Sequence, residues 1–312
     1  MRTVSAAGVA LTLLVLAAGA PAQQSGAPVF AVGTDVVHVT VSVRDVKGNL
    51  VGDLAAEDFA IYENGRLQTL QLCARAVEPG QEDALSLNLG LLLDTSESML
   101  KELKLSQEAA IRFLENIPRA RDLLTIFFDQ DIRISRYDSE NQQGLFERIL
   151  EAKGGGNTAL YDAIAVYLSR VQDSAGRKVL VLLSDGEDST SSLAHGELIE
   201  LVRSSSVTIY PIAFTGGFTA GGTRALRAKT FLMGLADLTG GQVFTPSASR
   251  ELAEVYQRIL NELTAQYVLG FTSGDERRDG KYRKLKVQVK REGLRVRHRM
   301  GYRAPSAEKP VS

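Results

Sequence analysis

The alternation of wholly apolar runs with amphipathic stretches over residues 85–265 constrains the fold of this chain more than any other feature. Each apolar run has the length of a β-strand, and the stretches between them carry apolar residues at helical spacing. Strands that are apolar on both faces are typical of a parallel sheet with helices packed against each side. The sequence therefore predicts an α/β fold with a doubly wound, mainly parallel sheet. The expected strands are 85–93, 123–128, 178–183, 207–213 and 242–244, and the expected helices are 104–117, 159–171, 196–204, 223–238 and 249–265.

The two flanking segments, residues 35–73 and 266–303, alternate apolar and polar side chains with a period of two. This pattern predicts half-buried strands, and Asn64-Gly65 predicts a tight hairpin turn because both residues accept positive φ angles. Each flank has only about 40 residues, which is too few to bury a stable core alone. We therefore expect the flanks to pair into one small β-sandwich-like unit, which the α/β domain interrupts.

The overall charge is close to balance, with 36 Lys and Arg against 37 Asp and Glu, and gives no reason to expect nucleic-acid binding. Residues 273–312 are nevertheless basic, with 13 Lys and Arg against 5 Asp and Glu. This segment is either a basic binding patch or, the interpretation we favour, the solvent-facing charges of a strand pair. One cysteine and three histidines argue against a disulfide framework and against a cysteine-rich or histidine-rich zinc site. Any bound metal must therefore be held mainly by oxygen atoms.

The N-terminus has the three parts of a secretory signal peptide. Arg2 supplies the positive charge, an apolar run covers residues 9–18, and Ala20-Pro21-Ala22 provides small residues at a cleavage spacing. The run is shorter than the roughly 20 residues that a membrane-spanning helix needs. We expect residues 1–22 to be removed and the mature chain to be periplasmic or extracellular with no transmembrane segment; an uncleaved N-terminal anchor is the alternative. In an exported chain we also expect the single thiol, Cys73, to be buried in a strand.

Polar residues follow two of the predicted strands and precede one predicted helix. Asp94–Ser98 follows the first strand, Gly154–Thr158 precedes the helix at 159–171, and Ser184–Asp188 follows the central strand. Ligands of open parallel sheets bind at the carboxyl ends of the strands. Each segment alone is an ordinary cap or turn. Together they offer two carboxylates and three hydroxyls, a donor set that hard divalent cations such as Mg²⁺ prefer.

In these three segments the sequence resembles the von Willebrand factor A domain, over residues 85–258. The resemblance implies a von Willebrand A, or Rossmann-like, fold and a metal-ion-dependent adhesion site, in which the hydroxyls bind directly and one carboxylate acts through water. The implied ion is a divalent cation, Mg²⁺ first, with Mn²⁺ or Ca²⁺ as alternatives. Glu97 stands where many members have glycine, and it adds negative charge beside the site. The metal residues that the resemblance implies are Asp94, Ser96, Ser98, Thr158 and Asp185.

The flanks extend this resemblance to exported, A-domain-containing proteins of acidobacteria. The implied layout is a signal peptide at 1–22, a β unit at 23–80, the A domain at 85–258, and a helix end with pairing strands at 259–312. The implied function is an exported adhesion module whose open metal site captures a carboxylate of a protein partner. The alternative is a structural or envelope-assembly protein in which the metal only stabilises the fold. An enzyme is disfavoured because the nucleophile-elbow, P-loop and dinucleotide-binding motifs are absent from the sequence.

Overall fold

The structure, a computed structural model, describes residues 36–76, 86–117, 120–137, 142–214 and 222–306. All of these residues belong to one unit, Asp35–Ser312. The expected signal peptide at residues 1–22 lies outside the described residues. Within the described ranges, no helix has the length and apolar character needed to cross a membrane.

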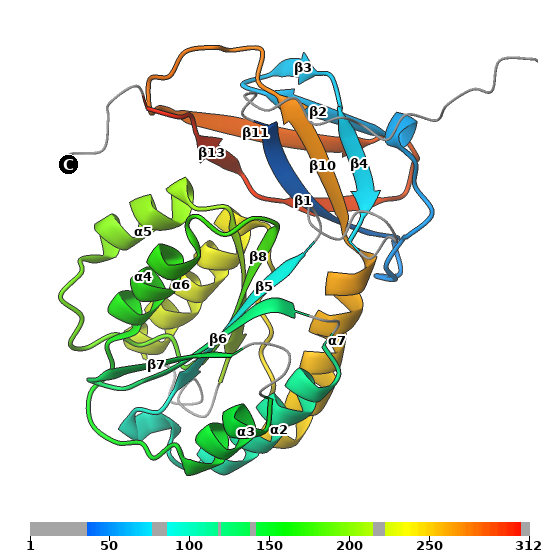
Figure 1. Ribbon diagram of the computed structural model, residues 1–312. Helices are drawn as coiled ribbons and strands as arrows, with labels where there is room; N and C mark the ends of the chain where they lie inside the picture. The colour runs from blue at the N-terminus through cyan, green and yellow to red at the C-terminus, as the bar shows by residue number, and fades with distance from the viewer. Residues whose placement is uncertain (1–35, 77–85, 118–119, 138–141, 215–221, 307–312) are drawn as a thin grey trace, which may run out of the picture. The chain divides into compact units, whose positions relative to one another are not determined.

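A five-stranded sheet in the order β7-β6-β5-β8-β9 forms the centre of the α/β domain (Figure 1). Four of its strands are parallel and β7, at one edge, is antiparallel to β6, which confirms the predicted doubly wound, mainly parallel sheet. The strand expected at 242–244 is reduced to a single bridge between Phe244 and Ile212. The edge strand β7 was not predicted from the sequence. The strands are β5 (Leu87–Asp94), β6 (Ala120–Phe128), β7 (Ile132–Tyr137), β8 (Arg177–Ser184) and β9 (Val207–Ala213).

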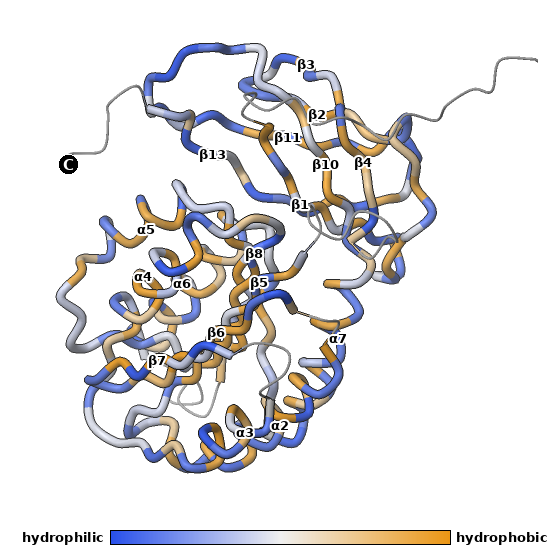
Figure 2. The backbone as a smooth tube through the Cα atoms, in the orientation of Figure 1, coloured by the Kyte–Doolittle hydropathy of each residue, from blue (hydrophilic) through white to orange (hydrophobic). Residues whose placement is uncertain are grey.

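Helices cover both faces of this sheet and enclose a separate hydrophobic core on each side (Figure 1). Consecutive residues of β5 enter different cores, since Leu91 and Leu93 pack on one side and Leu92 on the other. The hydrophobic colouring of the central strands in Figure 2 follows from this burial on both faces. One face carries α2 (Leu103–Glu115), α3 (Gln142–Glu151), which was not predicted, and α7 (Leu252–Ala265). The other carries α4 (Leu160–Val171), α5 (His195–Ser204) and α6 (Thr223–Thr239).

Close packing of α4 on the centre of β5 requires a glycine. A Cβ atom on Gly90 would lie 2.1 Å from the ring of Tyr167, so any side chain there would displace α4. The Tyr167 hydroxyl donates a hydrogen bond to the carbonyl oxygen of Val179 at 2.7 Å. These contacts fix α4 against β5 and β8, and therefore fix the position of its N-terminus at the edge of the sheet.

The flanks form two antiparallel sheets, β12-β1-β10-β4 and β13-β11-β2-β3, and each sheet contains strands from both flanks. β1 pairs with β10, and β2 pairs with β11. Apolar side chains of the two sheets share one core, which confirms the predicted sandwich-like unit. The strands are β1 (Val36–Arg44), β2 (Phe59–Glu63), β3 (Arg66–Gln68), β4 (Leu72–Arg75), β10 (Tyr267–Thr272), β11 (Tyr282–Val289), β12 (Arg295–His298) and β13 (Gly301–Arg303).

The sandwich corrects two expectations about single residues. Lys284 and Lys286 of β11 face solvent as expected, but Arg283 on the same strand is buried and pairs with Glu63 at 3.5 Å. The basic segment at 273–312 is therefore only partly a solvent-facing surface, because Arg283 is buried where it pairs with Glu63. Cys73 is half-buried rather than buried, because β4 is the edge strand of its sheet.

The buried carboxylate of Glu262, on α7, joins the α/β domain to the sandwich. It accepts hydrogen bonds from Ser42 and Arg44 of β1 at 2.9 and 2.8 Å. It also accepts one from Tyr210 of β9 at 2.8 Å and pairs with Arg297 of β12. Burial by itself raises the pKa of Glu262, but the two arginines and the tyrosine hydroxyl outweigh burial and lower the pKa below its ordinary value.

Removing this carboxylate should destabilise the whole protein. In Glu262→Ala two partly exposed guanidinium groups, Arg44 and Arg297, lose their carboxylate partner. Removing one partner of a fully buried pair costs about 3–5 kcal/mol of unfolding free energy, and the 27% exposure of both arginine side chains places the expected loss near the lower end of that range. Urea denaturation measures the loss, and Glu254→Ala, an exposed position on the same helix, is the control with an expected change within about 0.5 kcal/mol. Equal unfolding midpoints for Glu262→Ala and wild type would contradict this role of Glu262.

The carboxylate of Glu262 should make the unfolding free energy depend on pH. Because its pKa is lowered in the folded state, the stabilisation is complete above its ordinary value of 4.5 and is lost as pH falls through the folded-state value. The difference in unfolding free energy between wild type and Glu262→Gln should therefore be largest near neutrality and shrink at lower pH. Urea titrations across this range test the trend, and a constant difference down to pH ~3 would contradict it.

Candidate metal centre

The three polar segments meet at the carboxyl ends of β5 and β8. These strands are neighbours, so Asp94 and Ser184 lie at the ends of adjacent strands. The glycine-rich segment at 154–158 lies against the residues that follow β5, because the amide of Gly155 donates to the carbonyl oxygen of Thr95 at 2.8 Å. A parallel sheet thus places side chains from distant parts of the sequence at one edge.

Asp94 is the most constrained side chain of the group. It is 2% exposed, and its Oδ1 accepts hydrogen bonds from the amide and the hydroxyl of Ser96 at 3.0 and 2.6 Å. Its Oδ2 accepts a hydrogen bond from the Ser184 hydroxyl at 2.7 Å. Burial raises the pKa of Asp94 to about 7, against the opposing effect of these hydrogen bonds, and the negative charge of Asp185 adds to the increase.

Ser98 and Thr158 complete the set of hydroxyls. The Ser98 hydroxyl lies 3.2 Å from that of Ser96, and Ser98 is exposed, so the group opens to solvent on this side. Thr158 is buried, and its backbone is held by Ser189, whose amide donates to the Thr158 carbonyl at 2.9 Å and whose hydroxyl accepts from the Thr158 amide at 3.0 Å. The structure therefore links Asp94, Ser96 and Ser98 directly to one another, and links Thr158 to the loop that follows β8.

Asp185 begins that loop and is also buried. Its Oδ1 accepts a hydrogen bond from the amide of Glu187 at 3.0 Å. Gly186 between them has a φ angle of +79°, and a Cβ atom there would lie 2.8 Å from the side chain of Leu232 on α6. Glycine is thus needed at position 186, where the backbone adopts a left-handed conformation directly after Asp185.

Ser184, Asp129 and Thr95 also lie at this edge and were not among the predicted site residues. Ser184 orients Asp94 through its hydroxyl. Its position directly before Asp185 was a signal in the sequence that could have identified it as a site residue. Asp129 follows β6 and pairs with Arg133 at 2.7 Å, and Thr95 donates to the same carboxylate at 3.2 Å. Burial opposes ionisation of Asp129, but Arg133 and these hydrogen bonds outweigh it and lower its pKa. Asp129 directly follows the predicted strand at 123–128, and a carboxylate in that position was the signal in the sequence that could have identified it.

The residues present fit a divalent cation. Asp129 has Arg133 as its counter-charge, whereas Asp94 and Asp185 have no ion-pair partner in the described part of the chain. Two buried carboxylates close enough to raise a pKa, surrounded by hydroxyl oxygens, form a donor set that a cation stabilises. No cluster of three or more His, Cys, Asp or Glu side chains suited to a metal occurs among the described residues, so a cation here would depend on the hydroxyls.

Three comparisons with known proteins show what this chain is similar to. A sequence model of the von Willebrand factor type A domain matches residues 88–258. A von Willebrand factor type A protein from Catenulispora acidiphila is 12% identical over 90% of this chain and 76% of its own, with a TM-score of 0.48. Manganese-loaded TRAP protein from Plasmodium vivax is 12% identical over 80% of this chain and all of its own (100%), with a TM-score of 0.42.

A third solved structure is proximal thread matrix protein 1 from the mussel byssus, with a zinc-occupied MIDAS motif. It is 18% identical over 65% of this chain and 50% of its own, with a TM-score of 0.44, so the match spans half the length of the mussel protein. A search of the curated proteins finds no match.

Ser184→Ala should weaken divalent-cation binding without removing any of the five candidate ligands. The hydroxyl orients Asp94, and loss of such a supporting hydrogen bond typically lowers metal affinity about 10–100-fold. Isothermal titration with Mg²⁺ and Mn²⁺ measures the change, and Ser204→Ala, an exposed serine at the end of α5, is the control. Wild-type affinity in Ser184→Ala would show that Asp94 does not depend on this hydrogen bond.

Proposed function

The chain belongs to the von Willebrand factor type A domain family, and we propose that it is a metal-dependent binding module that captures a carboxylate of a protein partner. The observation that carries this proposal is the pair of buried carboxylates, Asp94 and Asp185, whose charges have no basic partner among the described residues. Removing carboxylates from water without a counter-charge is unfavourable, and a bound divalent cation supplies that charge.

The residues of this chain that would hold the ion are Asp94, Ser96, Ser98, Thr158 and Asp185. Hydrogen bonds from Ser96 and Ser184 already fix the orientation of the Asp94 carboxylate. Ser98 and Glu97 are exposed, so an acidic group of a partner can approach from their side. A bound divalent ion supplies positive charge and a coordination position that the partner's carboxylate completes. Glu97 reduces the attraction of an acidic partner by its own charge and therefore limits affinity.

In this proposal the protein is exported, is not an enzyme, and uses Mg²⁺ as its first candidate ion, with Mn²⁺ or Ca²⁺ as alternatives. Export rests on the signal-peptide pattern of residues 1–22. The competing role, in which the ion only stabilises the fold, is distinguished by the second experiment below.

Asp94→Asn should abolish stabilisation by the cation while preserving the shape of the side chain. At an Mg²⁺ concentration 100 times the Kd, linkage adds about 2.7 kcal/mol to the stability of wild type. For a domain of this size the increase corresponds to a rise of about 5–10 °C in Tm. Thermal melts of both proteins with Mg²⁺ and with a chelator measure it, and Asp237→Asn, an exposed aspartate on α6, is the control. The absence of any shift in wild type would contradict a metal centre.

Partner binding should require the ion. The full-length wild-type protein, immobilised and incubated with cell-envelope extract of its source organism, should retain a protein in Mg²⁺ that a chelator releases. Asp94→Asn should retain none of it, whereas Asp237→Asn should behave as wild type. A cation-dependent Tm combined with partner binding that the chelator leaves unchanged would support the stabilising role of the ion over the proposed one.

A further inference from the structure

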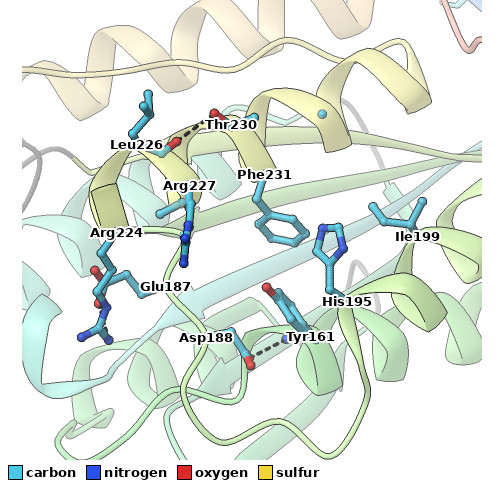
Figure 3. A pocket seen from close by; sticks show the side chains of 13 residues that line it. Tyr161, Glu187, Asp188, His195, Ile199, Arg224, Leu226, Arg227, Thr230 and Phe231 are labelled. Carbon is cyan, nitrogen blue, oxygen red and sulfur yellow. Dashed lines mark hydrogen bonds and ion pairs between the residues drawn. The ribbon is translucent and has the colours of Figure 1, made fainter. Parts of the chain in front are cut away.

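A cavity of about 870 Å³ opens between α6, the N-terminal ends of α4 and α5, and the loop that follows Asp185 (Figure 3). Its volume lies within the range of ligand pockets, about 300–1,000 Å³. Tyr161 of α4, His195 of α5 and Phe231 of α6 line it with their rings. The ring centre of Phe231 lies 5.1 Å from that of Tyr161 and 5.6 Å from that of His195. Three helices thus each contribute one ring to a single recess.

Two walls of this cavity continue directly from the candidate metal centre. Glu187 lines the cavity, and its amide is hydrogen-bonded to Asp185 at 3.0 Å. Tyr161 lies three residues after Thr158, in the first turn of α4, and its amide donates to Asp188 at 3.1 Å. A short segment of a partner can therefore reach the metal centre and the cavity at the same time.

Gly234 keeps the cavity open. It lies in the interior of α6 and lines the cavity, and a Cβ atom at this position would meet no atom within 4 Å. Glycine inside a helix is less stable than alanine, and no neighbouring atom requires it here. The helix is therefore less stable than it would be with alanine at a position where a side chain would occupy part of the cavity.

The rim of the cavity combines an unpaired positive charge with an exposed apolar side chain. Arg227 extends from α6 toward the rings and has no ion-pair partner in the described part of the chain, whereas Arg224 pairs with Glu187 at 2.8 Å (Figure 3). The other carboxylate of the lining, Asp188, accepts hydrogen bonds from the Tyr161 amide and the Ser191 hydroxyl. Leu226, which also lines the cavity, is 65% exposed. This rim is complementary to a segment that is both acidic and apolar.

We propose that this cavity receives an aromatic or large aliphatic side chain of the same protein partner whose carboxylate binds at the metal centre. The inference rests on the proposed function, because the metal centre supplies the second contact. The partner is then recognised by an acidic residue and an apolar residue placed a few positions apart, with additional negative charge favoured beside Arg227. The cavity gives the binding module its side-chain specificity, which a metal and a carboxylate alone do not provide.

The cavity is tested first without the metal, using naphthalene-2-carboxylate as the probe. Its fused rings match the aromatic recess, and its carboxylate matches Arg227. Ligand-observed NMR should show binding to full-length wild type and, unchanged, to Asp94→Asn. Gly234→Leu fills the cavity and should weaken binding at least tenfold, whereas Lys229→Leu, on the same helix but outside the cavity, should bind as wild type. No binding to wild type, or equal binding to Gly234→Leu, would overturn the inference.

The joint site is tested with random 12-residue peptides displayed on phage, bound to the full-length protein in Mg²⁺ and eluted with a chelator. We expect an enriched acidic residue followed or preceded at short spacing by an aromatic or large aliphatic residue. On Gly234→Leu the acidic residue should persist and the apolar preference should disappear. An acidic consensus with no apolar preference on wild type overturns the inference and leaves the proposed function intact. Enrichment without an acidic residue contradicts the proposed function, and with it the joint site, even where the cavity binds naphthalene-2-carboxylate.

Discussion

The parallel pairing of β5 with β8 determines where every other part of the candidate site can lie. Their carboxyl ends fall at the same edge of the sheet, so the residues that follow each strand converge although they are about 90 positions apart in the sequence. Gly90 allows α4 to pack closely on β5, and this packing places Thr158, just before α4, at that same edge. Burial of the strands thus positions the polar groups.

Two of the buried carboxylates, Glu262 and Asp94, have opposite electrostatic surroundings. Glu262 lies between the guanidinium groups of Arg44 and Arg297, and its pKa is lowered. Asp94 is buried among hydroxyls and near Asp185, and its pKa is raised to about 7. Burial raises the pKa of both carboxylates, but among the described residues only Glu262 has guanidinium groups that offset it. The contrast between the two sites supports the assignment of a cation-binding role to Asp94 more strongly than either site alone.

The sequence predicted those parts of the fold that depend on local pattern. Burial on both faces makes a strand wholly apolar, and burial on one face makes apolar and polar residues alternate. These two patterns identified the strands β5, β6, β8 and β9 and the strands of the flanks. β7 and α3 were missed because one is a half-exposed edge strand and the other a ten-residue helix with a glycine in its first turn. Among site residues, Ser184 was missed because its role depends on which strand lies beside β5. Tyr161, His195 and Phe231 come from three helices, so no spacing in the sequence links them.

One loop, residues 185–190, contributes to both the metal centre and the cavity. Asp185 is a candidate ligand, Glu187 lines the cavity, and Ser189 holds the backbone of Thr158. Gly186 in turn packs against α6, which carries Phe231 and Gly234. A shift of this loop on cation binding would therefore move one wall of the cavity. Coupling between two binding sites is reciprocal. If the cation changes the affinity of the cavity for an apolar group by some factor, the apolar group changes the affinity of the metal centre for the cation by the same factor. A partner that occupies both the metal centre and the cavity gains binding free energy beyond the sum of its two contacts only if both contacts favour the same conformation of this loop.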